Sequence, residues 1–187
     1  MVIVRKLMPD LLPAYLDFFD RLAFHDNKEW SRCYCNCFYV DHCKKPWRDW
    51  TAEENRQSVA ERIQAGQMWG HLAFAEDQAV GWCGAGPKDA IPIFQAEPRE
   101  NREHIGAITC FVVAQAFRGQ GIARQLLRGV LQDFAAMKLK IAEAYPRPGA
   151  TTAAENHFGP LALFYSEGFS FHQDDPSDGS IIVRKRL

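Results

Sequence analysis

The segment 111–123 places two glycines, Gly119 and Gly121, between an apolar run and an amphipathic run. The first run predicts a buried strand and the second a helix, so the glycines fall in the turn that leads into the helix. Backbone N–H groups at a helix N-terminus are unpaired and carry partial positive charge, and glycine lets an anion approach them closely. The segment therefore predicts a phosphate or pyrophosphate site, to which Arg118 adds a charged contact. A tight turn that binds nothing is the alternative.

Two other nucleotide-binding motifs are excluded by the spacing. The chain contains no Gly-x-x-x-x-Gly-Lys-Ser/Thr sequence, and the Gly-x-Gly-x-x-Gly pattern is incomplete because Arg124 stands at its third glycine.

Glu143 and Tyr145 occupy a short apolar segment that predicts a strand over residues 140–145. A carboxylate inside such a strand is uncommon, and alternation places both side chains on one face. If that face borders a cleft, Glu143 is a candidate proton acceptor; the alternative is a carboxylate paired with a nearby Arg or Lys. Loop candidates for the same proton transfer are Glu103, His104 and His157.

Four of the six cysteines fall between Cys33 and Cys43. A strand predicted over residues 33–40 would bring Cys33, Cys35 and Cys37 onto one face, which suits packing or the lining of a narrow pocket. Two alternatives stay open. One is a zinc site that also uses Cys43 and the adjacent histidine, although zinc sites more often pair Cys-x₂₋₄-Cys turns; the other is a reactive or redox thiol. The expectation is that no metal binds.

A framework of strands and helices must position these residues. Apolar runs predict strands over residues 1–7, 69–75, 79–84, 106–114, 140–145, 169–172 and 180–186. Three- and four-residue spacing predicts helices over residues 10–22, 51–65, 122–137 and 161–166. Asp10 is the expected N-cap of the first helix, and Thr51 with Glu54 predicts a capping box for the second. The order predicts an α/β fold with a mixed sheet, in one domain over residues 1–187.

Composition narrows the class of protein. The formal net charge of −1 gives no global attraction to nucleic acid or to an anionic membrane. No apolar run approaches the ~20 residues of a membrane span, and the first residues lack the pattern of a signal peptide. We therefore expect a cytoplasmic protein with reduced cysteines and no nucleic-acid or membrane partner.

The sequence Arg118-Gly-Gln-Gly-Ile-Ala123 resembles the pyrophosphate signature Arg/Gln-x-x-Gly-x-Gly/Ala of the GCN5-related N-acetyltransferase (GNAT) superfamily. Residues 163–169 resemble the helix-then-Gly-Phe motif of that family, and residues 182–187 resemble its last strand. The segments Ile-Thr-Cys-Phe-Val-Val and Glu-Ala-Tyr-Pro are similar to those of a bacterial subgroup. The resemblance implies the GNAT fold, with a splayed strand pair. It also implies contacts to coenzyme A from Phe111, Val112, Val113, Arg118, Gly119, Gln120, Gly121, Ile122, Ala123 and Phe164.

The resemblance further implies acetyl transfer from acetyl-CoA to an amine by direct attack in a ternary complex, with the N–H of Val112 or Val113 polarising the carbonyl. The family's leaving-group acid is a tyrosine whose position is held here by Phe164. Tyr165 follows about 100° further around the helix, so Tyr165, Tyr145 or water are the alternatives, with Glu143 as base. The missing tyrosine keeps a second class open, a non-catalytic acyl-CoA sensor.

In this family the acceptor pocket is built from N-terminal helices and loops. The tryptophans of that part of the chain are therefore candidates to line it: Trp30, Trp47, Trp50, Trp69 and Trp82. An aromatic pocket favours a small amine with an apolar part, and a peptide N-terminus or lysine stays open. The fold also suggests a homodimer.

Overall fold

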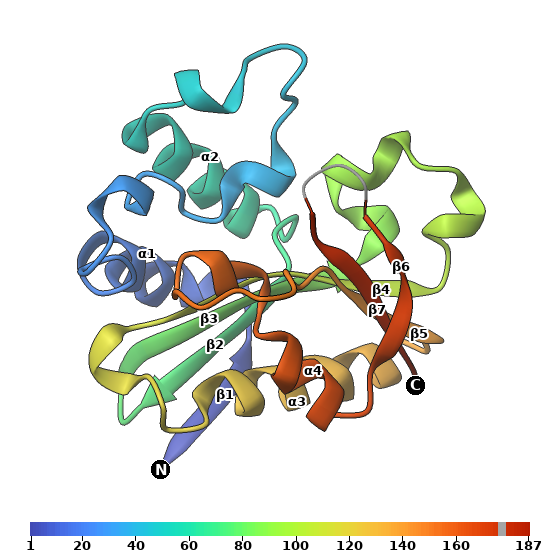
Figure 1. Ribbon diagram of the computed structural model, residues 1–187. Coiled ribbons are helices and arrows are strands. Elements are labelled where there is room, and N and C mark those ends of the chain that lie inside the picture. Colours follow the sequence, from blue (N-terminus) through green and yellow to red (C-terminus); the bar gives the residue numbers. More distant parts are fainter. Residues whose placement is uncertain (176–178) are drawn as a thin grey trace.

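A mixed seven-stranded sheet forms the centre of the molecule, with the strand order β1-β2-β3-β4-β5-β7-β6 (Figure 1). The computed structural model describes residues 1–175 and 179–187. The strands are β1 (Val2–Lys6), β2 (Gly70–Ala75), β3 (Gln78–Pro87), β4 (Ile105–Val113), β5 (Ile141–Ala144), β6 (Ser170–Asp174) and β7 (Ile181–Arg186). The helices are α1 (Leu12–Arg21), α2 (Ala52–Gln64), α3 (Ile122–Ala136) and α4 (Leu161–Ser166). The predicted α/β class with a mixed sheet is confirmed.

Antiparallel pairing joins β1 through β4, and the one parallel pair in the described sheet is β4 with β5. The register between β3 and β4 shifts between Gly84 and Ala85, so Thr109 is an extra residue in β4. The Thr109 hydroxyl donates to the Gly84 carbonyl at 3.1 Å. A bulge of this kind reverses which face the following residues point to.

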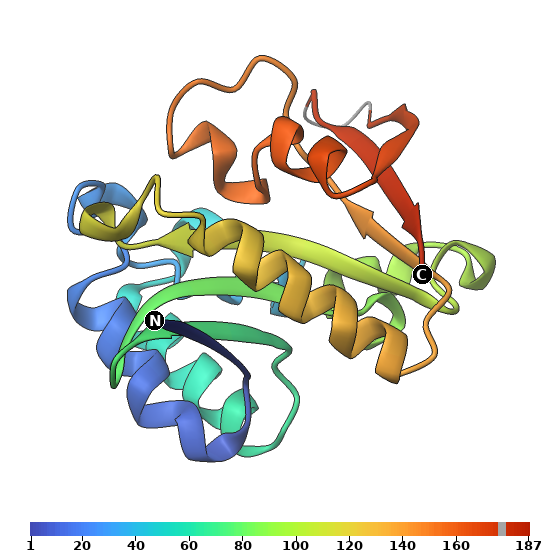
Figure 2. The same cartoon turned by 90° about the horizontal axis from the view of Figure 1, so that it is seen from below.

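The two faces of the sheet carry separate cores, which Figure 1 shows as helices above and below the strands. On one face α1 and α2 pack with Leu72, Trp82 and Val112. On the other face α3 and α4 pack with Ile108 and Phe111, and α3 crosses the sheet in Figure 2. The bulge explains why Ile108 and Phe111, three residues apart, share a face, since strict alternation would separate them.

Local sequence signals account for several helix ends. Thr51 accepts from the Glu54 N–H and the Glu54 carboxylate accepts from the Thr51 N–H, so the predicted capping box of α2 is confirmed. Asp10 does not cap α1. It lies in a short 3-10 turn before the helix and pairs with Arg5 instead. None of the helices in the described ranges is long and apolar enough to cross a membrane.

The predicted strand over residues 33–40 is wrong. Tyr34 and Cys35 adopt left-handed backbone angles, with φ of 47° and 50°, and a 3-10 turn follows over Asn36–Tyr39. Side-chain hydrogen bonds hold this shape. The Asn36 side chain donates to Asn55 at 2.9 Å, and Asn55 donates to the Arg32 carbonyl at 2.8 Å. Polar anchoring to α2 has therefore overridden the β-propensity of the aromatic and cysteine residues.

Candidate active site

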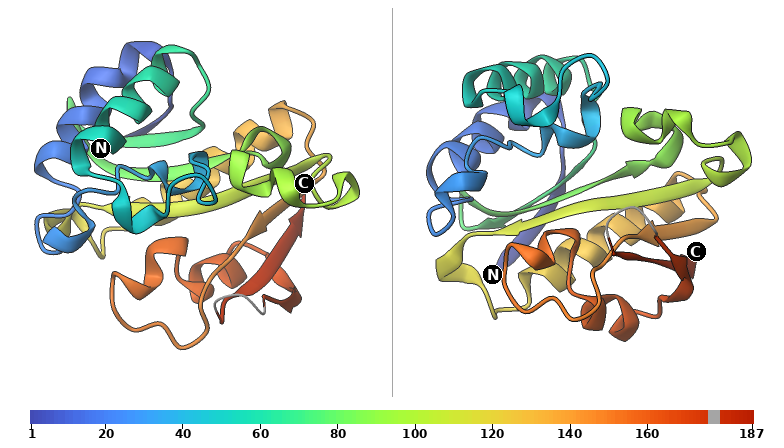
Figure 3. Two further views of the ribbon diagram at one scale, coloured as in Figure 1. Left: turned by 90° about the horizontal axis from the view of Figure 1, so that it is seen from above. Right: turned by 45° about the horizontal axis from the view of Figure 1, so that its top comes forward.

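The central feature of the site is the divergence of β4 from β5. Their pairing runs from Ile105 with Ile141 to Ile108 with Ala144, whereas β4 stays paired with β3 as far as Val113. The chain after β5 does not continue the strand but loops out, and its 3-10 turn Glu155–Phe158 packs alongside β4 (Figure 3). The second half of β4 therefore borders a gap between two sheet edges, as the splayed strand pair requires.

A cavity of about 620 Å³ opens along this half of β4. Its walls come from β4, from the loop after α1 and from the loop after β5. The lining residues that matter for the chemistry are Asp26, Glu29, Trp30, Cys33, Cys35, Cys37, Trp47, Cys110, Phe111, Val112, Val113, Arg118, His157 and Phe158. A volume of this size suits a small-molecule site. Of the tryptophans predicted for the acceptor pocket, Trp30 and Trp47 line the cavity, whereas Trp82 is fully buried in the core.

The glycine loop follows β4 directly. Gly119 and Gly121 have φ of 74° and 78°, and a Cβ at either position would meet no atom within 4 Å. Gly121 is the N-cap of α3, so the N–H groups of Ile122 and Ala123 belong to its unpaired first turn. The Gln120 amide donates to the Ala116 carbonyl at 3.1 Å. An open, left-handed turn at a helix N-terminus has the space and polarity that a pyrophosphate needs.

Arg118 is the residue directly before the first glycine of this loop. Its guanidinium donates to both carboxylate oxygens of Asp26, at 2.5 and 3.0 Å, and to the Val113 carbonyl at 2.9 Å. The hydrogen bond from Arg118 holds the pKa of Asp26 below its usual value, against the opposing effect of partial burial. The arginine is therefore placed between the end of β4 and the cavity, already paired with an anion.

Glu143 lies on the paired half of β5, in register with Ala107, and is fully buried. It accepts from Lys88, from Arg184 and from the Tyr145 hydroxyl, each at 2.6 Å. Burial opposes ionisation, but the hydrogen bond and positive charge of Lys88 outweigh it and hold the pKa of Glu143 below its usual value. The structure thus brings Glu143 and Tyr145 together as predicted, within an ion-pair network, and a carboxylate held ionised by two cations is a weak proton acceptor.

The two aromatic residues of α4 have different surroundings. Phe164 is fully buried and packs against Phe111 and Phe169, with ring centroids 6.1 and 5.2 Å apart. Tyr165 is 45% exposed on the outer side of the helix. Phe164 touches the open half of β4 through Phe111, and Tyr165 is not among the residues that line the cavity.

Sequence reasoning did not single out Asp26, Phe24, Phe38 or Phe158 as lining residues. They lie on loops, and the spacing of residues in the sequence does not predict that the loop after α1 meets the loop after β5. The length of both loops was the one weak indication of a functional site, since long loops in a compact domain often carry function. Two ring contacts join the loops: Trp30 with His157, with centroids 4.7 Å apart, and Phe38 with Phe158, with centroids 6.2 Å apart.

Four of the cysteines line this cavity: Cys33, Cys35, Cys37 and Cys110. The prediction that the clustered thiols line a pocket is supported, although a looped segment rather than a strand delivers them. Within the part of the chain that the structure describes, no group of three or more His, Cys, Asp or Glu side chains is arranged to hold a metal ion.

Solved structures with the same overall fold cover essentially the whole chain. A PaiA N-acetyltransferase of Thermoplasma acidophilum in complex with coenzyme A matches with a TM-score of 0.60 and 14% identity, over 100% of this chain and 99% of that one. A ribosomal-protein-alanine N-acetyltransferase of Brucella melitensis matches with a TM-score of 0.55 and 24% identity, over 99% of both chains. YncA of Salmonella typhimurium, solved with acetyl-CoA, matches with a TM-score of 0.60 and 14% identity, over 100% of this chain and 94% of that one.

These similarities establish the fold. A comparison with curated proteins finds no significant match. The sequence itself matches the model of the acetyltransferase (GNAT) family over residues 13–158, which takes in α1, the Cys33–Cys43 segment, β4, the glycine loop, α3 and the loop after β5. The chain therefore belongs to the GNAT family of acetyltransferases and is an acyltransferase.

Proposed function

We propose that this chain transfers an acetyl group from acetyl-CoA to a primary amine of a small molecule or peptide, by direct attack in a ternary complex. One observation carries the proposal: the half of β4 that has no partner strand on the β5 side lines a cavity and is followed, after one 3-10 turn, by an open, left-handed glycine loop at the start of α3. Residues 1–187 act as one domain in this proposal. In this proposal the reaction takes place in the cytoplasm, which agrees with the absence of a disulfide among the six cysteines of the structure.

In this proposal two parts of coenzyme A, the pyrophosphate and the pantetheine arm, bind to the glycine loop and to β4. Its pyrophosphate would accept from the N–H groups of the segment 119–123, where no side chain blocks the approach. Its pantetheine arm would pair with the backbone of Phe111, Val112 and Val113 on the side that β5 has left. Two proteins with the same fold have been solved with coenzyme A or acetyl-CoA bound, which supports the same co-substrate here.

In the reaction, the lone pair of a neutral amine attacks the carbonyl carbon of the thioester. The carbon–nitrogen bond forms, the carbon–sulfur bond breaks, and the proton lost by the amine must leave while the thiolate gains one. The N–H of Val112 or Val113 would stabilise the developing negative charge on the oxygen. Aromatic walls that include Trp30 and Trp47 favour an amine with an apolar part.

His157 is the titratable side chain best placed to take the amine proton. It lines the cavity, and its Nδ1 lies 2.7 Å from the Ala154 carbonyl. A carbonyl only accepts, so Nδ1 carries a proton and donates this hydrogen bond. Glu143 and Tyr145 sit in the ion-pair network instead, and Tyr165 is not among the residues that line the cavity. Their catalytic roles stay predictions, and Glu143→Gln and Tyr165→Phe test two of them. Water serves as the leaving-group acid in this proposal.

Calorimetric titration with acetyl-CoA tests the coenzyme site. The variant Gly121→Trp puts a large side chain into the loop. Gly66→Trp is a matched control, because Gly66 also has a positive φ of 67° and no atom within 4 Å of a Cβ, but it follows the end of α2 instead of beginning α3. We expect micromolar binding by the wild type and by Gly66→Trp, and none by Gly121→Trp. Absence of binding by folded wild-type protein would contradict the proposal.

Turnover then separates the enzyme from a non-catalytic acyl-CoA sensor. The observation that favours the sensor is Phe164, a buried residue without a hydroxyl group at the position of the family's catalytic tyrosine. With an accepted amine in hand, His157→Gln should lower kcat by at least tenfold, whereas Tyr165→Phe should leave kcat unchanged. Binding without release of free thiol for any amine in a broad screen would favour the sensor.

A further inference from the structure

Three of the cavity's thiols lie in a chain that acetyl transfer does not use. The Cys35 and Cys110 sulfurs are 3.0 Å apart, and both residues are buried. Cys33, two residues before Cys35, is only partly buried and lines the same cavity. The three thiols therefore lead from the cavity wall to a buried sulfur on β4.

The backbone around Cys33 favours its thiolate. Tyr34 and Cys35, which follow Cys33 directly, both have left-handed backbone angles. Successive N–H groups in such a turn form a concave anion site. The hydrogen bond from the Cys35 thiol, then these N–H groups and the charge of Arg32, hold the pKa of Cys33 below its usual value in spite of its burial. Burial raises the pKa of Cys35 well above its usual value, so Cys33 is the nucleophile of the set.

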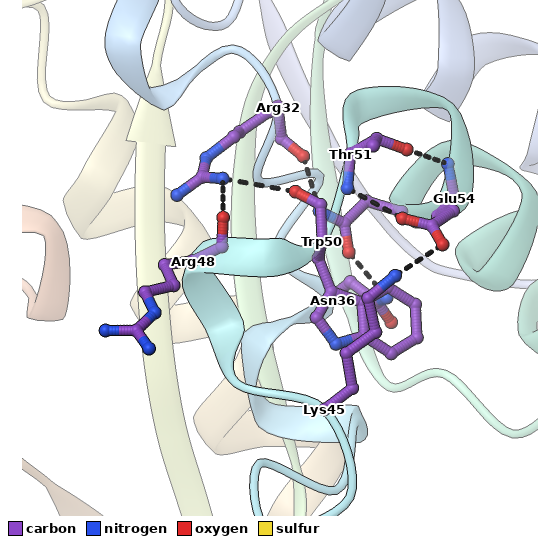
Figure 4. A network of polar contacts seen from close by, with 8 residues as sticks. Arg32, Asn36, Lys45, Arg48, Trp50, Thr51 and Glu54 are labelled. Carbon is purple, nitrogen blue, oxygen red and sulfur yellow. Dashed lines mark hydrogen bonds and ion pairs between the residues drawn. The ribbon is translucent and has the colours of Figure 1, made fainter.

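The position of these thiols is fixed from both sides. Arg32 donates to the carbonyls of Arg48 and Trp50 at 2.9 and 3.1 Å, and the buried Asn36–Asn55 pair joins the loop to α2 (Figure 4). On the sheet side, the bulge at Thr109 places Cys110 on the face that packs with Cys35. The short sulfur–sulfur distance is therefore built into the fold by two separate devices.

We propose that Cys33, Cys35 and Cys110 form an oxidisable thiol site that reacts with hydrogen peroxide entering through the cavity and closes a Cys35–Cys110 disulfide. The site goes beyond acetyl transfer, since it needs neither acetyl-CoA nor an amine. The product ties the loop after α1 to the open half of β4, one residue from Phe111.

The chemistry proceeds in three balanced steps. The Cys33 thiolate attacks one oxygen of hydrogen peroxide; a sulfur–oxygen bond forms, the oxygen–oxygen bond breaks, and hydroxide leaves with a proton as water. The Cys35 sulfur, losing its proton, attacks the Cys33 sulfenic sulfur; a disulfide forms and a second water leaves. The Cys110 sulfur, losing its proton, then attacks Cys35, and Cys33 departs as a thiolate that regains a proton. Overall, two thiols are oxidised and one peroxide is reduced to two waters.

Peptide mapping tests this directly. Cys110 is the sole cysteine between the trypsin sites Arg102 and Arg118, whereas the peptide 33–44 carries four cysteines. Reduced wild-type protein is treated with hydrogen peroxide, its remaining thiols are alkylated in denaturant, and it is digested. We expect a linked peptide pair that disappears on reduction. Chymotryptic cleavage after Tyr34 and Phe38, followed by fragmentation, assigns the partner as Cys35.

Three variants sharpen the result. Cys33→Ser should slow formation of the Cys35–Cys110 link at least tenfold, because the entry thiol is lost. Cys110→Ala should leave a peroxide-treated protein with no such link. Cys83→Ala is the matched control, a buried cysteine of the neighbouring strand that does not line the cavity, and should link at the wild-type rate. Circular dichroism checks that each variant is folded.

The outcomes are decisive without any activity assay. Wild-type protein that keeps all six thiols alkylatable, or that is oxidised only at the exposed Cys43, overturns the proposal. So does an equal rate of linking in Cys33→Ser, because the cavity-facing thiol would then not be the point of entry.

Discussion

The two halves of β4 resemble each other in sequence but not in surroundings. Ile105 through Ile108 is paired on both sides, with β3 and with β5, and lies beside the buried Glu143 network. Cys110 through Val113 is paired with β3 alone and lines the cavity on its other side. Both halves are buried and apolar, so the sequence of the strand does not distinguish them. The difference comes from where β5 ends.

This contrast separates stability from reactivity. In the paired half every charge of the Glu143 network has a partner within hydrogen-bond distance. The Tyr145 ring of this network also stacks on Phe94, with ring centroids 5.5 Å apart. In the open half the neighbours are thiols, a glycine loop with vacant space and an ion pair at the surface. We expect substitutions in the first region to change the free energy of unfolding and those in the second to change binding.

The largest effect is expected from Glu143→Gln. The substitution leaves Arg184 facing a neutral amide in a buried site and leaves Lys88 with Glu97 as its remaining carboxylate partner, which costs about 3 kcal/mol of unfolding free energy. Urea denaturation measures it. Glu103→Gln, which breaks an exposed pair with Arg99, is the control and should cost less than ~1 kcal/mol. A stable Glu143→Gln protein that binds acetyl-CoA but has lost turnover would instead make Glu143 the base.

The second prediction concerns pH. His71 on β2 is buried under α3, and burial, with the charge of Lys6, lowers its pKa from 6.5 to about 4. Between these values the unfolded chain binds a proton that the folded chain does not, so stability falls as the pH falls from 6.5 to 4, by ~3 kcal/mol in total. The Glu143 pKa is lowered, so its contribution is fully present above pH 4.5 and is lost as the pH falls from 4.5 through its folded value, mostly below the range in which His71 titrates.

Urea denaturation at several pH values checks this separation. The variant His71→Phe should lose most of the dependence between pH 6.5 and 4. A variant that keeps the wild-type slope would show that another group, in the Glu143 network or elsewhere, titrates there.

The third prediction compares two glycines at the ends of β4. In the paired half, a Cβ on Gly106 would lie 2.3 Å from the Phe134 ring, so Gly106→Ala should cost about 1–3 kcal/mol without changing acetyl-CoA affinity. In the loop, Gly119→Ala meets no atom within 4 Å and bears only the left-handed penalty of about 1–2 kcal/mol, but should weaken binding. Calorimetry and urea denaturation on both proteins test the pattern, and the reverse assignment of effects would break the comparison.

The smallest effect is expected at the surface pair. Asp26→Asn removes the partner of Arg118 from a site where both side chains are partly exposed, so the loss of stability should stay below ~1 kcal/mol. Because the guanidinium is then free to meet a phosphate, affinity for acetyl-CoA should rise a few-fold at low salt. Titrations at two salt concentrations measure this affinity. The control variant is Asp10→Asn, which breaks the exposed ion pair with Arg5 and leaves the glycine loop unchanged. Weaker binding would mean that Asp26 orients Arg118 for the coenzyme.

Much of the fold was predictable from local signals. The capping box of Thr51 and Glu54, the amphipathic spacing of α3 and the apolar run of β4 each act over a few residues, and all were found where the sequence placed them. The candidate coenzyme loop was predictable for the same reason, since its glycines, strand and helix are contiguous. The cysteine segment was not, because its shape depends on Asn55, about twenty residues away on α2.

By itself, the sequence determined the order of elements, the glycine loop and the family, since each rests on contiguous residues and short-range periodicity. Only the tertiary structure decided which side chains share a site. The extra residue at Thr109 faces Cys110 toward Cys35, the loop after β5 brings His157 to Trp30, and Lys88 and Arg184 converge on Glu143. The physical reason is that these meetings depend on register, a bulge and loop packing, where a shift of one residue reverses a face and no local pattern records the outcome.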